Sequence, residues 1–394
     1  MTALIQRWSF VLFALTIGPV GVVASKGVVW PVAIAGAAGV AAWIKDGCPR
    51  GWIDPVSIFA LAALTLWTAV STAWTFSPAD ALVLIARLAA LSIFGAGLLF
   101  TAVALDDRHR RFAHNALLVG IAIAFVLLVA GFVYGKKTGD ALWGRFFFDP
   151  LTTLNNGAIT ISLLAWPAFA LLWRRDRRWH AAICAGAIFG LLAFLSSGAA
   201  MMAPVVGVVG FLIVYWFRKR GALVIAAVLA VLVILSPQVA NYLLPVGKVH
   251  ATTAQLPPSA QHRLNMWRFA VEKIDEKPIW GWGMDASRSI PQDDRRLATN
   301  MEIMPLHPHN AFLQARLELG LPGAAIIAVL IGALFAGPVG NIGERASRAF
   351  AAGAACAYVA VAAVSYGMWQ NWWVAFAWAL VGLTAGARRP ATPG

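Results

Sequence analysis

The sequence predicts an all-helical protein that crosses a membrane many times. Hydrophobic residues make up 60% of the 394-residue chain, its mean hydropathy is +0.74, and only 17 residues are acidic. A water-soluble protein of this length could not bury so many apolar side chains in its interior, so this composition excludes a water-soluble fold. A bilayer core of ~30 Å needs about 20 apolar residues per helix, so the apolar runs can be counted as membrane spans.

The apolar runs indicate about twelve spans. In chain order their approximate limits are 8–24, 27–44, 53–74, 79–104, 112–135, 151–173, 180–197, 199–217, 221–236, 321–338, 349–366 and 369–387. The first run follows Arg7 and also fits a cleavable signal peptide, and its removal would leave about eleven spans.

The basic residues predict the orientation of these spans. Loops on the side of the N-terminus contain seventeen Lys and Arg residues, including the run at 174–178, whereas the opposite short loops contain four. Because Lys and Arg near span ends are retained in the cytoplasm, both termini are predicted to be cytoplasmic. This topology accounts for most of the +14 net charge without a basic patch shaped for nucleic acid, so nucleic-acid binding is not expected.

The chain is predicted to form a single transmembrane domain over residues 1–394, with one long polar loop. This loop spans residues 237–309, between the ninth and tenth spans, and the charge pattern places it outside the cytoplasm. It contains eight basic and seven acidic residues, whose charges nearly cancel. Individual cations must therefore matter more there than the overall field.

A helix is predicted inside this loop, after Pro257 and Pro258. Ser259 is a suitable N-cap, and Arg263 lies one turn before Trp267 on the same face of the helix. Apolar residues recur at helical spacing: Leu264, Trp267, Val271 and Ile274. Pro278 is expected to end the helix, and the glycines after it predict a tight loop at 281–283.

Two interpretations of this helix are open. It could lie on the lipid headgroups, with Trp280 and Trp282 in the aromatic belt of the membrane interface. Alternatively, Arg263 and Trp267 form part of a binding site, with the guanidinium placed where the aromatic ring packs.

A second helix is predicted after two closely spaced histidines, His307 and His309. Pro308 suits the first helical position, Gly320 is a suitable residue just past the end, and Pro322 prevents continuation. His309 would then lie in the first turn, where the positive end of the helix dipole disfavours imidazolium. A neutral imidazole at the membrane boundary could act as a general base.

Other roles for these histidines are also possible. His309 could simply cap or pack the helix, and His250, His262, His307 and His309 together could bind zinc. Their spacing does not match a zinc motif, and the outer segments contain no D-x-D metal signature and no phosphate-binding P-loop. We therefore predict no metal site and no cofactor.

Further polar residues are predicted on the same outer side. Arg145 precedes the sixth span, and Asn155 and Asn156 lie in its first turns. Arg87 lies within the fourth span, ~12 Å from its outer edge, where a cation is usually functional unless it snorkels to the headgroups. Arg87, Arg145 and Arg263 could together form an outward-facing anion site.

These motifs resemble the O-antigen ligase and polymerase superfamily. The C-terminal match consists of Arg263-x3-Trp267-x2-Ala270, Pro278-x2-Gly281-x-Gly283, and His309-Asn310-x2-Leu313 followed by Glu318-Leu319-Gly320-x2-Gly323. The N-terminal match consists of Gly144-Arg145 with Asn155 and Asn156, although the usual NPN turn is LNN in this chain. Twelve spans with a large outer loop between the ninth and tenth resemble the ligases in particular.

The resemblance implies a bacterial inner-membrane glycosyltransferase of the GT-C type. Such an enzyme moves O-antigen from undecaprenyl pyrophosphate to a sugar of lipid A-core at the periplasmic face, with inversion at the anomeric carbon. By this analogy His309 is the catalytic base, and Arg145 and Arg263 bind the donor pyrophosphate. Arg87, Asn155, Asn156, Trp267 and Asn310 are the further candidate substrate-binding residues.

Three other functions are open at this point. An O-antigen polymerase and a protein O-oligosaccharyltransferase are similar to the ligases around the histidine. A flippase or transporter of lipid-linked sugars would place ionisable groups near the middle of the bilayer, where Arg87 is the main candidate.

Overall fold

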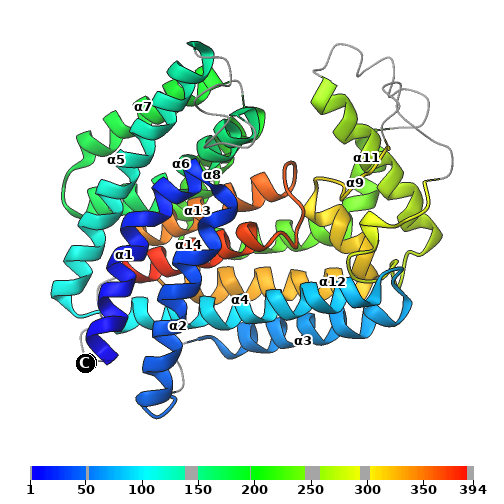
Figure 1. Cartoon of the computed structure of the whole chain (residues 1–394), viewed down its shortest axis with the longest axis horizontal. Coiled ribbons are helices and arrows are strands. Elements are labelled where there is room, and N and C mark those ends of the chain that lie inside the picture. The colour runs from blue at the N-terminus through cyan, green and yellow to red at the C-terminus, as the bar shows by residue number, and fades with distance from the viewer. Residues whose placement is uncertain are drawn as a thin grey trace.

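The computed structural model describes residues 2–49, 53–137, 150–195, 197–244, 258–292 and 302–387, which form helices and their connections without a β-strand (Figure 1). The helices are α1 (Thr2–Val23), η1 (Ser25–Val28), α2 (Val29–Lys45), α3 (Pro55–Ser71), η2 (Thr72–Trp74), α4 (Pro78–Ala104), α5 (Asp107–Lys137), α6 (Pro150–Arg174), α7 (Arg178–Leu195), α8 (Gly198–Ile234), α9 (Ser236–Leu243), α11 (Pro258–Glu276), η3 (Ala286–Arg288), α12 (Ala311–Leu334), η4 (Phe335–Val339), α13 (Arg345–Ala362) and α14 (Asn371–Gly386).

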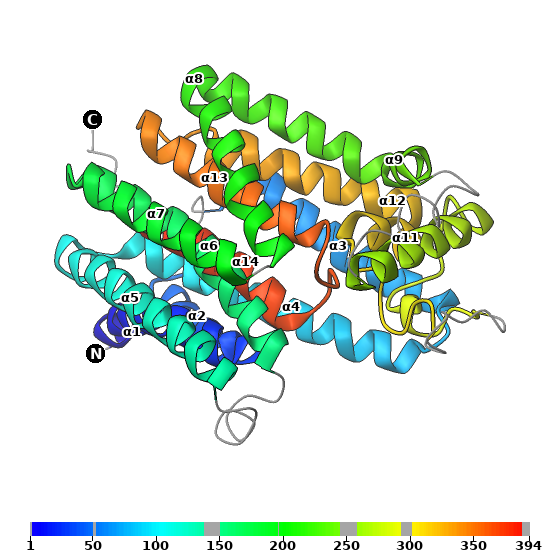
Figure 2. The ribbon, with the colours of Figure 1, turned by 90° about the horizontal axis from the view of Figure 1, so that it is seen from above.

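The long helices form one bundle. Helix α1 packs against α5, α2 against α4, and α8 against α12 and α13. Figures 1 and 2 both place α9 and α11 together at one end of the bundle, beside the start of α12. The loop helix predicted before Pro278 is therefore present as α11.

In the described part of the chain, nine helices are long and apolar enough to cross a membrane. The prediction of an all-helical, multi-pass membrane protein is confirmed, whereas the count of twelve spans is not. Helix α8 covers two predicted spans and counts once. Helix α13 carries Arg345 and Arg348 in its first turn, which lowers its hydropathy, and α14 has only 16 residues.

The two spans predicted at 199–217 and 221–236 are the two halves of α8. Arg218 interrupts the helix with a left-handed backbone, φ 53° and ψ −132°. The chain bends so sharply there that a Cβ on Gly221 would lie 2.7 Å from the carbonyl oxygen of Ile213. The basic residues at 218–220 thus form a short connection between two helical segments.

Helices α2 and α4 approach each other closely through glycines. A Cβ on Gly36 would lie 2.1 Å from the carbonyl oxygen of Phe94, and a Cβ on Gly39 would lie 1.9 Å from that of Gly97. Without hydrophobic driving force inside a bilayer, such backbone contact is a principal means of holding helices together. The N-terminal half of the bundle is therefore fixed by residues that have no side chain.

The connections between helices collect at two ends of the bundle. At one end, which we call the basic end, Arg7 forms an ion pair with Asp106 at 2.7 Å, Arg175 donates to Asn115 at 2.9 Å, and Lys219 donates to Asn341 at 3.0 Å. We call the other end, where α9, α11 and the start of α12 meet, the His309 end. Most of the loops predicted to be cytoplasmic thus share one end.

Helix α11 buries its apolar face against protein. Met266, Phe269 and Ala270 are at most 2% exposed and lie in one cluster with Leu313 and Leu317 of α12. Burial of Phe269 and Met266 contributes roughly 1.5–3 kcal/mol each. Because α12 covers this face, the structure does not support a helix that rests on lipid headgroups.

Candidate active site at the His309 end

His309 precedes the helix that was predicted to contain it. Helix α12 begins at Ala311, and its N-cap is Asn310, whose side-chain oxygen accepts hydrogen bonds from the backbone N–H groups of Phe312 at 3.0 Å and Leu313 at 3.1 Å. The prediction that Pro308 starts the helix is wrong. The Asn310 side chain caps the free N–H groups of the first turn, so the helix begins after Asn310 and not at Pro308. The helix dipole therefore acts on His309 from outside the helix.

The backbone at His309 is left-handed, with φ 51°. This conformation is uncommon for residues other than glycine, although asparagine, aspartate and histidine adopt it more often than most, and it persists where surrounding contacts fix it. Here it turns the ring toward the connection between α13 and α14, where Nδ1 donates a hydrogen bond to the carbonyl oxygen of Ser365.

The contact with Ser365 determines the tautomer of His309. A carbonyl oxygen only accepts, so Nδ1 carries the proton and Nε2 of the neutral ring is left with a lone pair. Burial lowers the pKa of His309, and the nearby charges of Arg263 and His262 lower it further, against the opposing effect of the Ser365 carbonyl. His309 is thus neutral near pH 7 and able to take up a proton at Nε2.

His307 is engaged at both ring nitrogens. Its Nδ1 accepts the backbone N–H of His309 at 3.2 Å, so the proton of the neutral ring is on Nε2. This atom lies 3.1 Å from the side-chain amide of Gln370, whose oxygen accepts the proton when the amide is turned by 180°. The two imidazole rings lie with centroids 4.3 Å apart. Burial, followed by the charges of His309 and Arg288, lowers the pKa of His307 to about 3. His307 therefore supports His309 and has no nitrogen left for a substrate.

Arg263 and Trp267 lie on the half of α11 that faces this region. Arg263 is half-buried, and burial lowers its pKa while the neighbouring Tyr366 hydroxyl raises it. Trp267 is one turn further along and its indole Nε1 is buried without a hydrogen-bond partner. Arg263 is near enough to His309 to affect its pKa, so the structure brings these two predicted site residues together.

Asn156 also joins the cluster, through a residue that sequence reasoning missed. Its side-chain oxygen accepts a hydrogen bond from the Tyr366 hydroxyl at 2.6 Å, and its amide donates to Ser25 at 2.9 Å. Tyr366 follows Ser365, the partner of His309. Asn155, by contrast, is exposed.

Two predicted cations are not part of the described cluster. Arg145 lies outside the described residues. Arg87 is exposed on α4, whereas Ala81 and Ile85 on the opposite side of the same helix are buried in a cluster with Met284 and Leu319. The prediction that Arg87 joins an anion site with Arg263 is therefore not supported, because its side chain faces away from the protein.

The outer histidines that the structure describes, His262, His307 and His309, do not form a metal site. His262 Nε2 donates to the Ile303 carbonyl at 3.2 Å, and His250 lies outside the described residues. Within the described ranges, no three His, Cys, Asp or Glu side chains are grouped as metal ligands.

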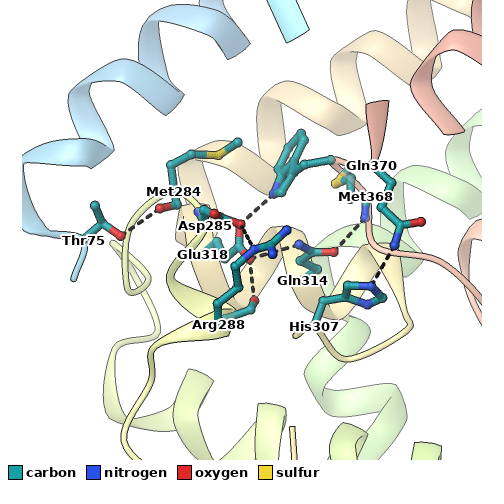
Figure 3. A network of polar contacts seen from close by, with 11 residues as sticks. Thr75, Met284, Asp285, Arg288, His307, Gln314, Glu318, Met368 and Gln370 are labelled. Atoms are coloured by element: carbon teal, nitrogen blue, oxygen red, sulfur yellow. Dashed lines mark hydrogen bonds and ion pairs between the residues drawn. The ribbon is translucent and has the colours of Figure 1, made fainter. Parts of the chain in front are cut away.

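A buried network, shown in Figure 3, supports the connection that holds His309. Its centre is Glu318, which is 0% exposed. One carboxylate oxygen accepts hydrogen bonds from the Ser287 hydroxyl and from Gln314 at 3.0 Å. The other accepts from the backbone N–H of Asp285 at 3.1 Å and from the Trp369 indole at 2.7 Å.

The network continues from Glu318 to the segment that contains Ser365. The oxygen of Gln314 accepts the backbone N–H of Met368 at 2.7 Å, and Gln370 lies against His307. Glu318 and Gln314 are one helical turn apart, and Glu318 was part of the family signature, but only the fold shows that both reach residues 368–370. The network therefore joins α12, the turn before η3 and the connection between α13 and α14.

Glycines fix the outer part of α12 against the segment after α11. Gly320 has φ 64° and interrupts α12, as its predicted place at a helix end requires. The backbone N–H groups of Trp282 and Gly283 donate to Leu317 and Glu318 at 2.8 Å each, and a Cβ on Gly281 would lie 2.6 Å from the Glu318 carbonyl oxygen. The tight loop predicted at 281–283 thus forms hydrogen bonds with residues 317–318, just before Gly320 interrupts α12.

Comparison with known proteins shows what this chain is similar to. Residues 182–328 match a family described as O-antigen ligase, a range that contains α8, α11 and the His309 motif. The resemblance to the O-antigen ligase superfamily is confirmed. Together with the nine apolar helices of the described residues, this similarity indicates a multi-pass membrane protein that resembles the O-antigen ligases.

Individual relatives are similar to this chain over more residues than this range. The chain is 28% identical to a protein of Rickettsia conorii over 274 residues, in an alignment that covers 68% of this chain and 65% of the relative. It is 27% identical to a protein of Rickettsia typhi over 322 residues, in an alignment that covers 80% of this chain and 77% of the relative. Both relatives carry the name "putative polysaccharide ligase".

Proposed function

We propose that this protein transfers O-antigen polysaccharide from undecaprenyl pyrophosphate to a sugar hydroxyl of lipid A-core. The observation that carries the proposal is the state of His309, whose Nδ1 is held by the Ser365 carbonyl and whose Nε2 lone pair remains available close to Arg263. A base and a fixed cation in one place match the two needs of glycosyl transfer from a lipid diphosphate.

In the proposed reaction, Nε2 of His309 takes the proton of the acceptor hydroxyl as its oxygen attacks the anomeric carbon of the donor sugar. A new C–O bond forms, the bond between that carbon and the pyrophosphate oxygen breaks, and the configuration inverts. A hydroxyl is a poor nucleophile until its proton has an acceptor, and general-base catalysis of this kind contributes ~10²–10⁴-fold.

The pyrophosphate departs with the bonding electrons, so its charge must be met by fixed cations. We assign this role to Arg263 and to Arg145, since guanidinium groups bind phosphate oxygens at two points without a metal ion. Asn156 and Trp267 are proposed to line the substrate site. Asn310, which caps α12 with its side-chain oxygen, has only its amide left for a substrate contact.

We further propose twelve spans in a GT-C-type arrangement, in the bacterial inner membrane. Both termini would lie in the cytoplasm, and the loop at 237–309 and the His309 end would lie in the periplasm, where ligation takes place. The collection of Lys and Arg residues at the basic end supports this orientation.

Reconstitution tests the proposed function. Purified protein is mixed with lipid-linked O-antigen and lipid A-core in the absence of nucleotide, and the products are separated by size. The expected product is lipopolysaccharide bearing the O-antigen ladder. Lengthening of the lipid-linked donor alone would instead identify a polymerase, and transfer only to an added acceptor protein would identify an oligosaccharyltransferase.

A further inference from the structure

Helix α12 buries a cation that the proposed chemistry does not use. Arg316 is 6% exposed, and its Nε and Nη1 atoms have no hydrogen-bond partner among the described residues. No carboxylate of the described residues lies within ion-pair distance of it. A buried charge with unused donors is costly, so proteins rarely retain one without a compensating ligand or role.

The opposite charge on the same helix does not serve Arg316. Glu318 follows it by two residues, which places the two side chains about 200° apart around the helix. Four neutral donors already satisfy Glu318, two at each oxygen. The carboxylate is thus complete within the protein, whereas the guanidinium is incomplete.

Arg316 belongs to the part of α12 that packs against α11. Leu313 and Leu317, which flank Arg316 on α12, pack in one cluster with α11 residues, and Trp267 packs against that cluster. The indole N–H of Trp267 is likewise buried without an acceptor. The two packed helices therefore each bury donors without an acceptor among the described residues, and a ligand that served both would have to supply negative charge and several acceptor oxygens.

Phosphate oxygens have this chemistry. Arg316 lies five residues after the start of α12, about 8 Å along the helix from the segment that carries His309. We propose that Arg316, with the Trp267 indole, binds a phosphate of the lipid-linked diphosphate, in addition to Arg263. The identity of this ligand as the donor rests on the proposed function.

A thermal-stability and binding experiment tests the proposal without measuring turnover. The full chain in neutral detergent is compared with Arg316→Met and Arg316→Lys, and with Arg268→Met as a control, since Arg268 has a protein partner in Glu272 at 3.3 Å. The probe is geranylgeranyl diphosphate, and phosphatidylglycerol serves as the competing source of phosphate.

Arg316→Met is expected to raise the Tm of the ligand-free protein by about 2–4 °C, because an unpaired buried charge is removed. It should also weaken diphosphate binding roughly tenfold or more, with Arg316→Lys in between. Arg268→Met should leave diphosphate binding unchanged.

Three results would overturn the proposal. A lower Tm or failure to fold in Arg316→Met would mean that Arg316 has a structural role, and unchanged diphosphate binding would remove it from the site. An equal, Arg316-dependent effect of phosphatidylglycerol would assign the site to membrane phospholipid. If diphosphate binding depends on Arg316 but reconstituted ligation fails, the proposed function falls and the phosphate site stands.

Discussion

At the basic end of the bundle Arg7 lies 2.7 Å from the Asp106 carboxylate and Arg174 lies 3.7 Å from that of Glu344, whereas at the His309 end Arg316 has two donors without partners. The buried Arg110 at the basic end donates to the Leu105 carbonyl at 2.6 Å. Arg348 there has an Nε without a partner among the described residues, but it is only half-buried. The buried acid at the His309 end, Glu318, is satisfied by neutral groups.

This difference separates charges that serve topology from charges that serve chemistry. Where acids or amides of the protein accompany the cations, the folded protein itself provides the contacts that offset the cost of burying their charge. At the His309 end three cations also have carboxylate partners: Arg268, Lys273 and Arg288. Arg263 and Arg316 have no ion-pair partner among the described residues, and one imidazole lone pair is available. Substitutions of the same kind at the two ends should therefore differ in effect.

The largest effect is expected from His309→Ala. Loss of the base should lower the ligation rate ~10²-fold or more while leaving donor binding largely intact. His307→Ala should have a smaller effect, because both nitrogens of His307 contact protein. Steady-state rates and donor affinity of both variants are the measurement, and full activity in correctly inserted His309→Ala would exclude it from the mechanism.

The pH dependence of the same reaction follows from the direction of the pKa shift. Burial lowers the pKa of His309, so the ring stays neutral until the pH falls below this lowered value. Ligation should therefore be constant near neutral pH and decline on the acid side, with an apparent pKa at or below ~6.5. A decline centred well above that value would point to a different base.

An intermediate effect is expected from Arg263→Lys. An ammonium cannot reproduce the planar fork, and the loss of one charge-assisted hydrogen bond of ~1.5–3 kcal/mol should lower kcat/KM about tenfold or more. Arg145→Lys should behave alike. The matched change at the basic end, Arg175→Lys, should leave kcat/KM within about twofold of the parent, because its exposed contact with Asn115 contributes little. Equal kcat/KM values in the three Lys variants would show that the arginines of the two ends do not differ in their effect on ligation.

Glu318→Gln should affect both stability and turnover. In either orientation its new NH₂ group meets at least one N–H donor, so the free energy of unfolding should fall by ~1–3 kcal/mol. The contact from Gln314 to Met368 should weaken with it, and kcat should fall more than donor affinity. Glu344→Gln is the control, since this exposed partner of Arg174 is expected to change stability by less than ~1 kcal/mol. A stable, fully active Glu318→Gln protein would show that the network does not position His309.

The smallest effect is expected from metal removal. If guanidinium groups alone meet the pyrophosphate charge, dialysis against EDTA should leave the ligation rate unchanged. The assay is ligation before and after chelation, followed by addition of Mg²⁺ or Zn²⁺. Loss of activity that either ion restores would require the outer histidines or acids to be reconsidered as ligands.

Local patterns in the sequence predicted much of this fold. The apolar run at 79–104 became α4, the helical spacing before Pro278 became α11, and Gly320 interrupts α12 where its conformational freedom indicated. Each of these depends on residues within a few turns of one another. The bilayer requirement for about 20 apolar residues makes such runs easy to recognise.

The parts that were missed depend on contacts between distant segments. The start of α12 was misplaced because Pro308 and Asn310 are both acceptable near a helix start, and the side chain of Asn310 prevails. Tyr366 reaches Asn156 across 210 positions of sequence, and Trp369 reaches Glu318 across 51. No local pattern shows that Ser365 lies against His309, so the tautomer of the base could not be predicted before the fold was known.

The left-handed backbone at His309 also sets stability against activity in directed evolution. Asparagine or glycine adopts φ near 51° with less strain, so libraries selected only for heat resistance should favour these residues at position 309. Libraries selected for polysaccharide transfer should retain histidine. If the two selections favour different residues at position 309, the strained backbone there lowers stability and the imidazole is needed for activity.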